Sequence, residues 1–251
     1  QVCTIGGNVA ENSGGAHCLK YGFTTHHVLG ATFVTAEGQV AELGGVRDAA
    51  GYDLLGMVIG SEGTLGIVTE VVLRLVRVPE TTETVLAAFS TMGDAGEAVS
   101  RIIAAGITPA AIEMMDRLAI EACEQIVHAG YPDCGAALIV ELDGPRVEAE
   151  EFLAQVIEIC GASGATEMRV AASETERALI WKARKAAFAS MGRISPNYYV
   201  QDGVIPRTRL RDVLEEIGAP SKKNGSDVGK VVRAGAGNGH RRGCHQGPVG
   251  G

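Results

Sequence analysis

A glycine-rich segment near the start of the chain has a backbone suited to ligand binding. Residues 4–15 hold two Gly-Gly pairs around a short run of small and amide residues, namely Gly6, Gly7, Asn8, Asn12, Gly14 and Gly15. Glycine has no Cβ, so its backbone adopts positive φ readily and can come close to a ligand. Successive N–H groups there can converge on an anion such as a phosphate. A glycine-rich turn between strands is the alternative, because the spacing fits neither the dinucleotide nor the P-loop fingerprint.

A second glycine-rich segment lies at residues 60–69 and continues directly into an apolar–polar alternating run. Two such segments favour a cofactor-binding domain over an isolated turn. Because the chain starts on the first segment with no strand before it, we expect it to be part of a larger domain. His17 follows the first segment and can approach a ligand, although an ordinary polar loop residue is the simpler interpretation.

The bulk composition excludes some classes of partner. The formal net charge is −8 and aromatic residues make up 4% of the 251 residues, so neither a positive field nor a base-stacking surface favours nucleic acid. No apolar run reaches the length of a membrane span. The six cysteines form no Cys-x-x-Cys motif and are expected to be reduced. These features predict a protein of the cytoplasm, either free or peripheral at the inner face of the cell membrane.

The elements that would position these residues fall into two parts. Residues 28–36 and 39–43 predict a β-hairpin around Glu37-Gly38, and residues 65–76 predict one or two further strands. Pro79 interrupts this pattern and marks the expected domain limit, so that residues 1–78 form the first domain.

Strands and helices alternate beyond Pro79. We expect strands at 84–89, 136–142, 166–170 and 198–205, and helices at 94–105, 112–129, 147–160, 175–189 and 206–217. This order predicts an α+β domain over residues 79–220, with helices on one face of a mostly antiparallel sheet. Residues 221–251 are polar and Gly/Arg-rich, and we expect a loose tail there.

Several separated motifs resemble one family. They are both glycine-rich segments, Lys20-Tyr21-Gly22, Gly51-Tyr52-Asp53-Leu54-Leu55, Trp181-Lys182-Ala183-Arg184-Lys185 and Met191 to Tyr199. In this order and spacing they resemble the flavin-linked D-2-hydroxyacid oxidases and dehydrogenases, which have the vanillyl-alcohol-oxidase type of FAD-binding fold. The resemblance covers roughly residues 1–217.

The resemblance implies that residues 1–78 are the second half of an FAD-binding domain whose first half lies outside this sequence. The residues implied to line the pyrophosphate and flavin are Thr4, Gly6, Gly7, Asn8, Glu11, Asn12, Gly14 and Gly15. The opposite wall would consist of Glu62, Gly63, Gly66, Ile67 and Val68. Residues 79–220 would be the cap domain over the substrate face of the flavin.

The same resemblance implies the oxidation of a small 2-hydroxyacid by hydride transfer to FAD. Arg184 stands at the family's position for the residue that binds the substrate carboxylate, which suits the planar fork of a guanidinium. Its position on a charged helix would otherwise favour a solvated surface residue.

A family motif that supplies metal ligands and a histidine departs from its pattern here. Arg233 stands where the family has the first histidine, Ala236 stands where it has an aspartate, and His240 keeps the second histidine. An arginine offers no lone pair to a metal ion. His240 therefore remains as a candidate catalytic residue and as a single candidate ligand for the family's divalent metal. This altered segment predicts a divergent C-terminus.

The resemblance implies glycolate as the substrate expected first, oxidised to glyoxylate by a multisubunit glycolate oxidase. It also implies two partner subunits, one FAD-binding-like and one iron–sulfur. A D-lactate or other D-2-hydroxyacid dehydrogenase is the second hypothesis. A truncated, non-catalytic fragment is the third.

Overall fold

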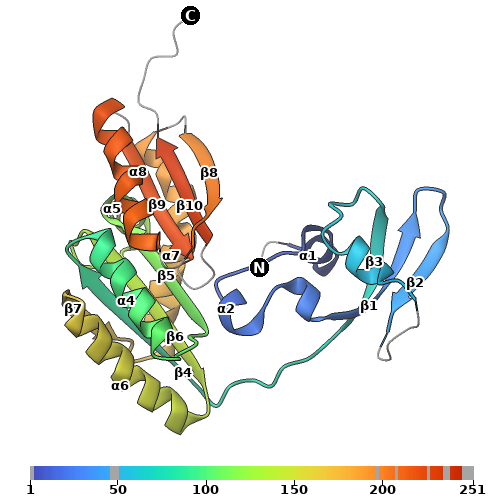
Figure 1. Cartoon of the computed structure of the whole chain (residues 1–251), viewed down its shortest axis with the longest axis horizontal. Helices are drawn as coiled ribbons and strands as arrows, with labels where there is room; N and C mark the ends of the chain where they lie inside the picture. Colours follow the sequence, from blue (N-terminus) through green and yellow to red (C-terminus); the bar gives the residue numbers. More distant parts are fainter. Residues whose placement is uncertain are drawn as a thin grey trace, which may run out of the picture. The chain divides into compact units, whose positions relative to one another are not determined.

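The computed structural model of the chain describes residues 3–45, 51–195, 198–206, 209–224, 227–233 and 238–244. The chain forms two compact units, Gln1–Val78 and Pro79–Gly251. Each unit has a sheet of its own (Figure 1). Within the described residues, no helix is both long enough and apolar enough to cross a membrane.

The first unit is a small antiparallel sheet with short helices. Its elements are α1 Ile5–Glu11, α2 Cys18–Tyr21, the 3-10 helix η1 Thr24–His26, β1 Val28–Thr35, β2 Val40–Gly44, α3 Leu54–Val58 and β3 Gly66–Leu73. The strand order is β2-β1-β3. The predicted hairpin is confirmed, since β1 pairs with β2 around the turn that contains Gly38.

Helix α1 is anchored on this sheet by a small apolar core. Val9 is fully buried and shares a cluster with Val28 and Ile59, against which the half-buried Val68 and Val71 pack. The burial of Val9 therefore fixes which side of α1 faces the sheet.

The second unit contains a seven-stranded sheet in the order β7-β4-β6-β5-β9-β10-β8, in which every neighbouring pair is antiparallel. Its strands are β4 Thr81–Phe89, β5 Ala111–Asp116, β6 Ala136–Gly144, β7 Ala165–Val170, β8 Tyr198–Val204, β9 Asp227–Arg233 and β10 Asn238–Cys244. Its helices are α4 Met92–Ala104, α5 Arg117–Val127, α6 Arg146–Ala162, α7 Glu174–Ile194 and α8 Leu210–Asn224. The predicted antiparallel α+β class is confirmed.

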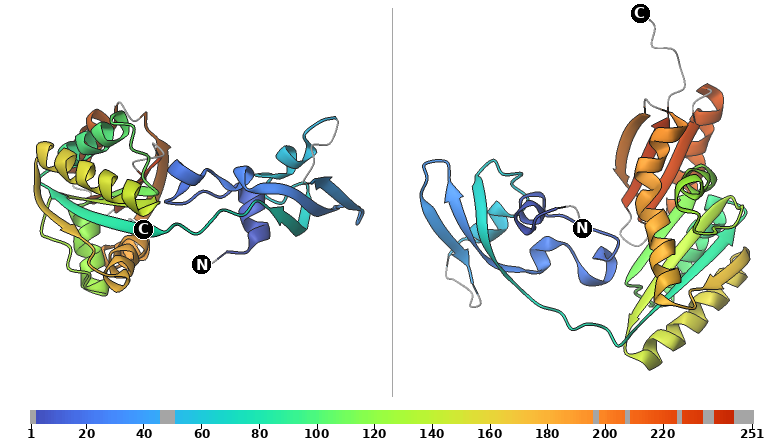
Figure 2. Two further views of the ribbon diagram at one scale, coloured as in Figure 1. Left: turned by 90° about the horizontal axis from the view of Figure 1, so that it is seen from below. Right: turned by 180° about the vertical axis from the view of Figure 1, so that it is seen from behind.

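Helices cover both faces of this sheet, whereas the sequence predicted one covered face. In Figure 1 helices α4, α6 and α8 lie on one side, and the view from behind in Figure 2 brings α5 and α7 to the front. The reason lies in the central strands, because all six residues of β5 are buried. A strand that is buried on both faces needs a packed layer on each side.

One predicted helix is wrong in part. The segment 112–129 was expected to be helical, but its first residues belong to β5 and α5 begins only at Arg117. Asp116 ends the strand and caps the helix, since its carboxylate accepts the N–H of Ala119 at 3.1 Å. Strand pairing on both sides of β5 overrides the helix propensity of its Glu and Met residues.

The C-terminal part also differs from prediction. The last predicted helix begins at Leu210 rather than at Pro206. The segment expected to be a loose tail contributes β9 and β10 to the sheet, and Val231 and Val232 are buried there. Two consecutive valines with a pairing strand on each side bury enough apolar surface to order this segment.

Candidate functional site

Residues 5–11 of the first glycine-rich segment form the helix α1, whereas residues 12–15 lie outside it. Thr4 caps α1, and its hydroxyl oxygen accepts the N–H of Gly7 at 3.0 Å. Asn12 ends the helix in the left-handed conformation with φ 44°, and its side-chain oxygen accepts the N–H of Thr25. Glycines in the first turn lower the intrinsic helix propensity, but the packing of Val9 in the small core stabilises the helix.

The glycines of this segment have different roles. A Cβ on Gly6 would lie 3.3 Å from the carbonyl oxygen of Val68, and one on Gly14 would lie 2.6 Å from the ring of Phe23. Both positions therefore allow close packing within the unit. A Cβ on Gly15 would meet no atom within 4 Å, so this glycine faces open space.

The second glycine-rich segment is joined directly to α1. The N–H of Gly60 donates to the carbonyl of Val9 at 2.9 Å, and the N–H of Glu62 donates to that of Ala10 at 2.8 Å. Glu62 adopts φ 54°, a left-handed conformation uncommon outside glycine. The two segments predicted as opposite walls thus meet at the end of α1.

Only one of two neighbouring apolar residues in β3 stays available to a ligand. Val68 packs in the small core, whereas Ile67 is 70% exposed on the other face of the strand. Successive residues of a strand point to opposite faces, so the two side chains cannot both contact one flavin ring. Gly66, just before them, must be glycine, since a Cβ would lie 2.2 Å from the carbonyl oxygen of Val34.

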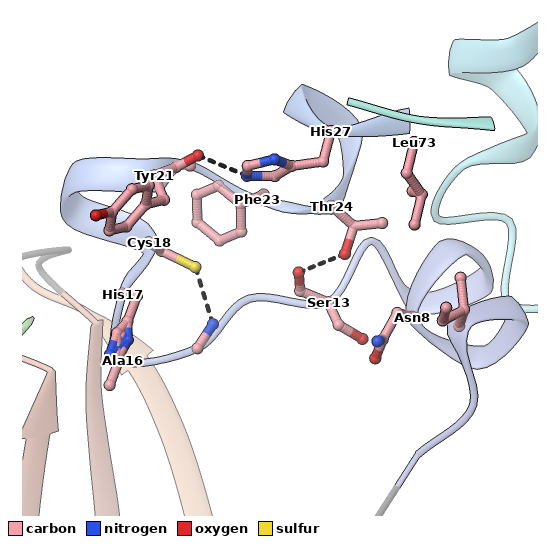
Figure 3. A pocket seen from close by; sticks show the side chains of 13 residues that line it. Asn8, Ser13, Ala16, His17, Cys18, Tyr21, Phe23, Thr24, His27 and Leu73 are labelled. Atoms are coloured by element: carbon pink, nitrogen blue, oxygen red, sulfur yellow. Dashed lines mark hydrogen bonds between the residues drawn. The ribbon is translucent and has the colours of Figure 1, made fainter. Parts of the chain in front are cut away.

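A cavity of about 370 Å³ lies beside this segment in the first unit (Figure 3). Of the predicted cofactor residues, Asn8 and Gly15 line it; the others named from the two segments do not belong to its lining. His17, for which the sequence favours an ordinary polar loop residue over a ligand contact, lines it too. The remaining lining includes Ser13, Cys18, Tyr21, Phe23, Thr24 and His27.

Hydrogen bonds fix the walls of this cavity. The N–H of Gly15 lies 2.8 Å from the sulfur of Cys18, and the hydroxyl of Thr24 donates to the carbonyl of Ser13 at 2.8 Å. One ring nitrogen of His27 lies 2.8 Å from the carbonyl oxygen of Tyr21. These contacts join α1 to the turn that precedes β1, so the cavity is formed by two adjacent segments of the chain.

Arg184 lies in the second unit on α7, and Glu113 is its partner. The Nε of Arg184 donates to Oε2 of Glu113 at 2.8 Å, and one Nη group donates to the same oxygen. The arginine side chain is 15% exposed and the glutamate 1%. The sequence missed Glu113, although a single carboxylate within an apolar run is the signal of a buried charge pair.

Two ionisable groups near this pair, the Cys123 thiol and the Tyr131 phenol, are protonated at physiological pH. Burial raises the pKa of the Cys123 thiol to about 11, and burial also raises the pKa of the Tyr131 phenol; Arg184 opposes both shifts. The hydroxyl of Tyr131 donates to the carbonyl of Ile180 at 3.0 Å, which ties the loop after α5 to α7. The guanidinium thus lies near these two protonated groups and pairs with the carboxylate of Glu113.

The described residues do not fit a metal site. Among them no group of three or more His, Cys, Asp or Glu side chains is arranged to hold an ion. Arg233 ends β9 opposite Glu113. His240 lies in β10 opposite Asp202 of β8, and its side chain lies outside what the structure describes. Ala236 falls outside the described residues altogether.

Family models match most of the chain. The model of the C-terminal domain of FAD linked oxidases matches residues 78–244, and the model of an FAD binding domain matches residues 1–44. The first of these covers the whole seven-stranded sheet with its helices. The second covers α1, the cavity segment and the β1–β2 hairpin.

Individual proteins show the same similarity. Glycolate oxidase subunit GlcD of Escherichia coli K12 is 48% identical over 241 residues, which are 95% of this chain and 48% of the relative. A probable mitochondrial D-lactate dehydrogenase of Danio rerio is 30% identical, over 93% of this chain and 48% of the relative. The chain therefore spans about half the length of these curated relatives.

A solved structure supports the fold. Alkyldihydroxyacetonephosphate synthase superposes with a TM-score of 0.72 at 21% identity, over 95% of this chain and 49% of that one. At this identity the likeness concerns the architecture alone.

Proposed function

The chain belongs to the family of FAD-linked oxidases, and from this premise we propose that it is part of an oxidoreductase that converts a 2-hydroxyacid to a 2-oxoacid. The substrate proposed first is glycolate, with glyoxylate as the product. The similarity to GlcD supports this choice. The observation that carries the proposal is the Arg184–Glu113 pair, which presents a fixed guanidinium on the domain that the family places at the substrate.

Arg184 is proposed to bind the substrate carboxylate. Glu113 occupies two of the five N–H donors of the guanidinium, and the others are directed elsewhere in its plane. A carboxylate that accepts from two of these would be fixed in position and orientation. This contact holds Cα of the substrate in one place, which is the contribution of the chain to a reaction whose rate depends on geometry.

FAD is the cofactor of the family, and when bound it supplies the acceptor for two electrons and a proton as hydride. The cavity beside Gly15 fits part of it, because about 370 Å³ lies within the range of about 300–1,000 Å³ that small-molecule sites occupy. Its amide, hydroxyl and imidazole groups suit a heteroaromatic or ribityl portion. Asn8 and Gly15 are proposed as the contacts from the first segment, and Ile67 as an apolar contact from β3.

The remaining parts of the proposal follow from the motifs. Residues 1–78 would complete a flavin domain and residues 79–244 would form the cap domain. His240 is proposed to accept the proton of the substrate hydroxyl, on the strength of its motif position. An assembly with other subunits is proposed because the relative GlcD is named as a subunit. That these subunits are FAD-binding-like and iron–sulfur, and that the assembly is peripheral to the membrane, is proposed from the family resemblance alone. D-Lactate is the second candidate substrate, favoured by relatives named as D-lactate dehydrogenases.

Anaerobic flavin reduction tests the proposal. The chain is loaded with FAD, freed of excess and mixed with glycolate, D-lactate or L-lactate, and the loss of oxidised-flavin absorbance is followed. Bleaching by glycolate ahead of both lactates is the expected result, and preference for D-lactate would replace glycolate by the second candidate. Retained flavin that none of the three acids reduces would overturn the proposed activity. A chain that retains no flavin would be the non-catalytic fragment.

A further inference from the structure

Glu113 is a charged residue in the interior of the sheet, where burial of a charge is unfavourable. It lies in the middle of β5, which is the fourth of seven strands, and it is 1% exposed. A carboxylate in such a place is tolerated only when a partner compensates for its lost hydration. The partner is Arg184, which reaches down from α7 with two N–H groups.

The contact fixes the plane of the guanidinium. Nε and one Nη group donate to the same carboxylate oxygen, so rotation about the last bonds of the side chain is blocked. An arginine side chain loses substantial rotamer entropy when it is ordered, and here that loss has already occurred in folding. A ligand that binds the other donors therefore meets a group already in position.

A second buried carboxylate gives an internal comparison. Glu141 of β6 is 6% exposed, and it accepts the indole N–H of Trp181 and the hydroxyl of Thr84. Trp181 precedes Arg184 by one helical turn on the same helix. Both glutamates thus attach α7 to the sheet, while Glu113 is the one that contacts the guanidinium.

A second arginine lies close to Glu113 and bears on whether an anion can approach. Arg233 of β9 lies directly opposite Glu113 in the sheet. Residues that face each other in an antiparallel pair project from the same face with Cβ atoms about 5 Å apart. Glu141 of β6 lies on this face as well, so two arginines and two glutamates leave the face without a net negative charge that would repel an incoming carboxylate.

We propose that Glu113 is a positioning residue that orients Arg184 for the carboxylate of a 2-hydroxyacid. This inference rests on the proposed function. It extends that function by assigning the geometry of the carboxylate site to a buried side chain on another element. Loss of the orienting contact would allow Arg184 to adopt several rotamers, and affinity for the acid would fall.

Fluorescence titration with glycolate tests this inference on the full chain. Trp181 is the single tryptophan of the sequence and lies one turn from Arg184, so its emission reports on the site directly. The variants are Glu113→Gln, Arg184→Lys and, as the matched control, Glu141→Gln. The dissociation constant for glycolate is taken from the midpoint of the titration curve, which does not depend on the starting emission of each variant. In a separate assay, the KM for glycolate is measured on the FAD-loaded protein.

The expected pattern is specific. Glu113→Gln should raise the dissociation constant and KM for glycolate by about tenfold or more, and Arg184→Lys should raise them at least as much. Glu141→Gln should destabilise the fold comparably yet leave both constants within about twofold, because Glu141 acts on Trp181 and Thr84. Should Glu113→Gln fail to fold, Glu113→Asp keeps the charge, draws the carboxylate back by one methylene and should weaken binding in the same way.

Two outcomes would overturn the inference. If the Glu113 variant binds glycolate as the Glu141 control does, Glu113 only holds the helix, and the role proposed for Arg184 is untouched. If Arg184→Lys binds as the wild type does, Arg184 is not the carboxylate residue. In that case the proposed site and the role of Glu113 both fail.

Discussion

The carboxylate of Asp116 accepts the backbone N–H of Lys230 at 2.8 Å, across 114 positions of the chain. Its other oxygen caps α5 through the N–H of Ala119. Asp116 therefore joins β5, α5 and β9 at one point, at the end of the strand that carries Glu113. This carboxyl group is buried, and its burial makes it sensitive to pH.

The pKa of Asp116 predicts an unusual pH dependence of stability. Burial raises this pKa from 3.8 to about 6, against the lowering effect of the two N–H donors and Lys230. Between these values the folded protein holds a proton that the unfolded chain has released, so this group makes the free energy of unfolding fall as pH rises. Asp116→Asn removes this effect. The free energy of unfolding of the variant, relative to that of the wild type, should therefore rise by about 3 kcal/mol between pH 3.8 and about pH 6.

Urea unfolding across this pH range measures the difference. The variant also loses one acceptor of a backbone N–H, which costs about 1 kcal/mol at every pH and does not alter the slope. Asp133→Asn is the control, because Asp133 is exposed and pairs with Arg117 on the surface. A difference between Asp116→Asn and wild type that stays constant with pH would contradict the raised pKa.

Replacement of Gly135 by alanine should strongly destabilise the protein. A Cβ at this position would lie 1.9 Å from the carbonyl oxygen of Ser90, which is backbone and cannot rotate away. The N–H of Gly135 also donates to Phe89 at 2.9 Å, so the strand cannot shift without losing this bond. Gly135→Ala should lower the free energy of unfolding by about 2–3 kcal/mol. Gly203→Ala is the control, since no atom lies within 4 Å of its Cβ position, and a similar loss in both would refute the steric explanation.

The part of the fold that the sequence predicted correctly follows from alternation and helix signals. The β1–β2 hairpin has a glycine turn between apolar runs, and α6 and α7 have helical runs bounded by caps such as Ser173. Strand β5 has no alternation because it is buried on both faces. Periodicity cannot distinguish such a strand from a buried helix, although Asp116 is a recognisable N-cap.

The candidate site was predictable to a different degree in each unit. Motifs alone placed Asn8, Gly15 and Arg184 in a site, and the structure puts the first two on a cavity wall and the third in a buried ion pair. The partner of Arg184 was not predictable, because Glu113 lies 71 positions away and meets it only through packing of α7 on the sheet. The single glutamate in the apolar run of β5 indicates a buried charge, but local sequence does not show which residue is its partner.

The segment with Arg233, Ala236 and His240 lacks most of the metal ligands of the family motif, so we expect that metal ions do not stabilise the chain. Arg233 has no lone pair, and the described residues hold no group of three potential ligands. Addition of Zn²⁺ or Mn²⁺ should therefore leave the melting temperature unchanged, as should a chelator, because only a ligand that binds the folded state raises it. A rise with either ion, abolished by His240→Gln, would show that the chain does hold a metal.

Substitutions of the neighbouring residues Gly14 and Gly15 should have different effects on the stability of the first unit. A Cβ on Gly14 would lie 2.6 Å from the ring of Phe23 and 2.9 Å from the sulfur of Cys18, so Gly14→Ala should destabilise the first unit by about 1–3 kcal/mol. Gly15 lines the cavity and has open space at its Cβ position, so Gly15→Leu should leave stability within about 0.5 kcal/mol.

FAD binding separates the two variants. A leucine at position 15 would project toward the proposed flavin site, and overlap worth about 1–3 kcal/mol corresponds to a loss of affinity of about fivefold to a hundredfold. Flavin fluorescence during titration of the chain measures this loss, and Ala36→Leu, in the exposed β1–β2 turn, controls for an added apolar side chain. Unchanged affinity in Gly15→Leu would place the flavin elsewhere in the unit. Gly14→Ala would then lower affinity only as far as it unfolds the protein, which thermal melts of the same samples would measure.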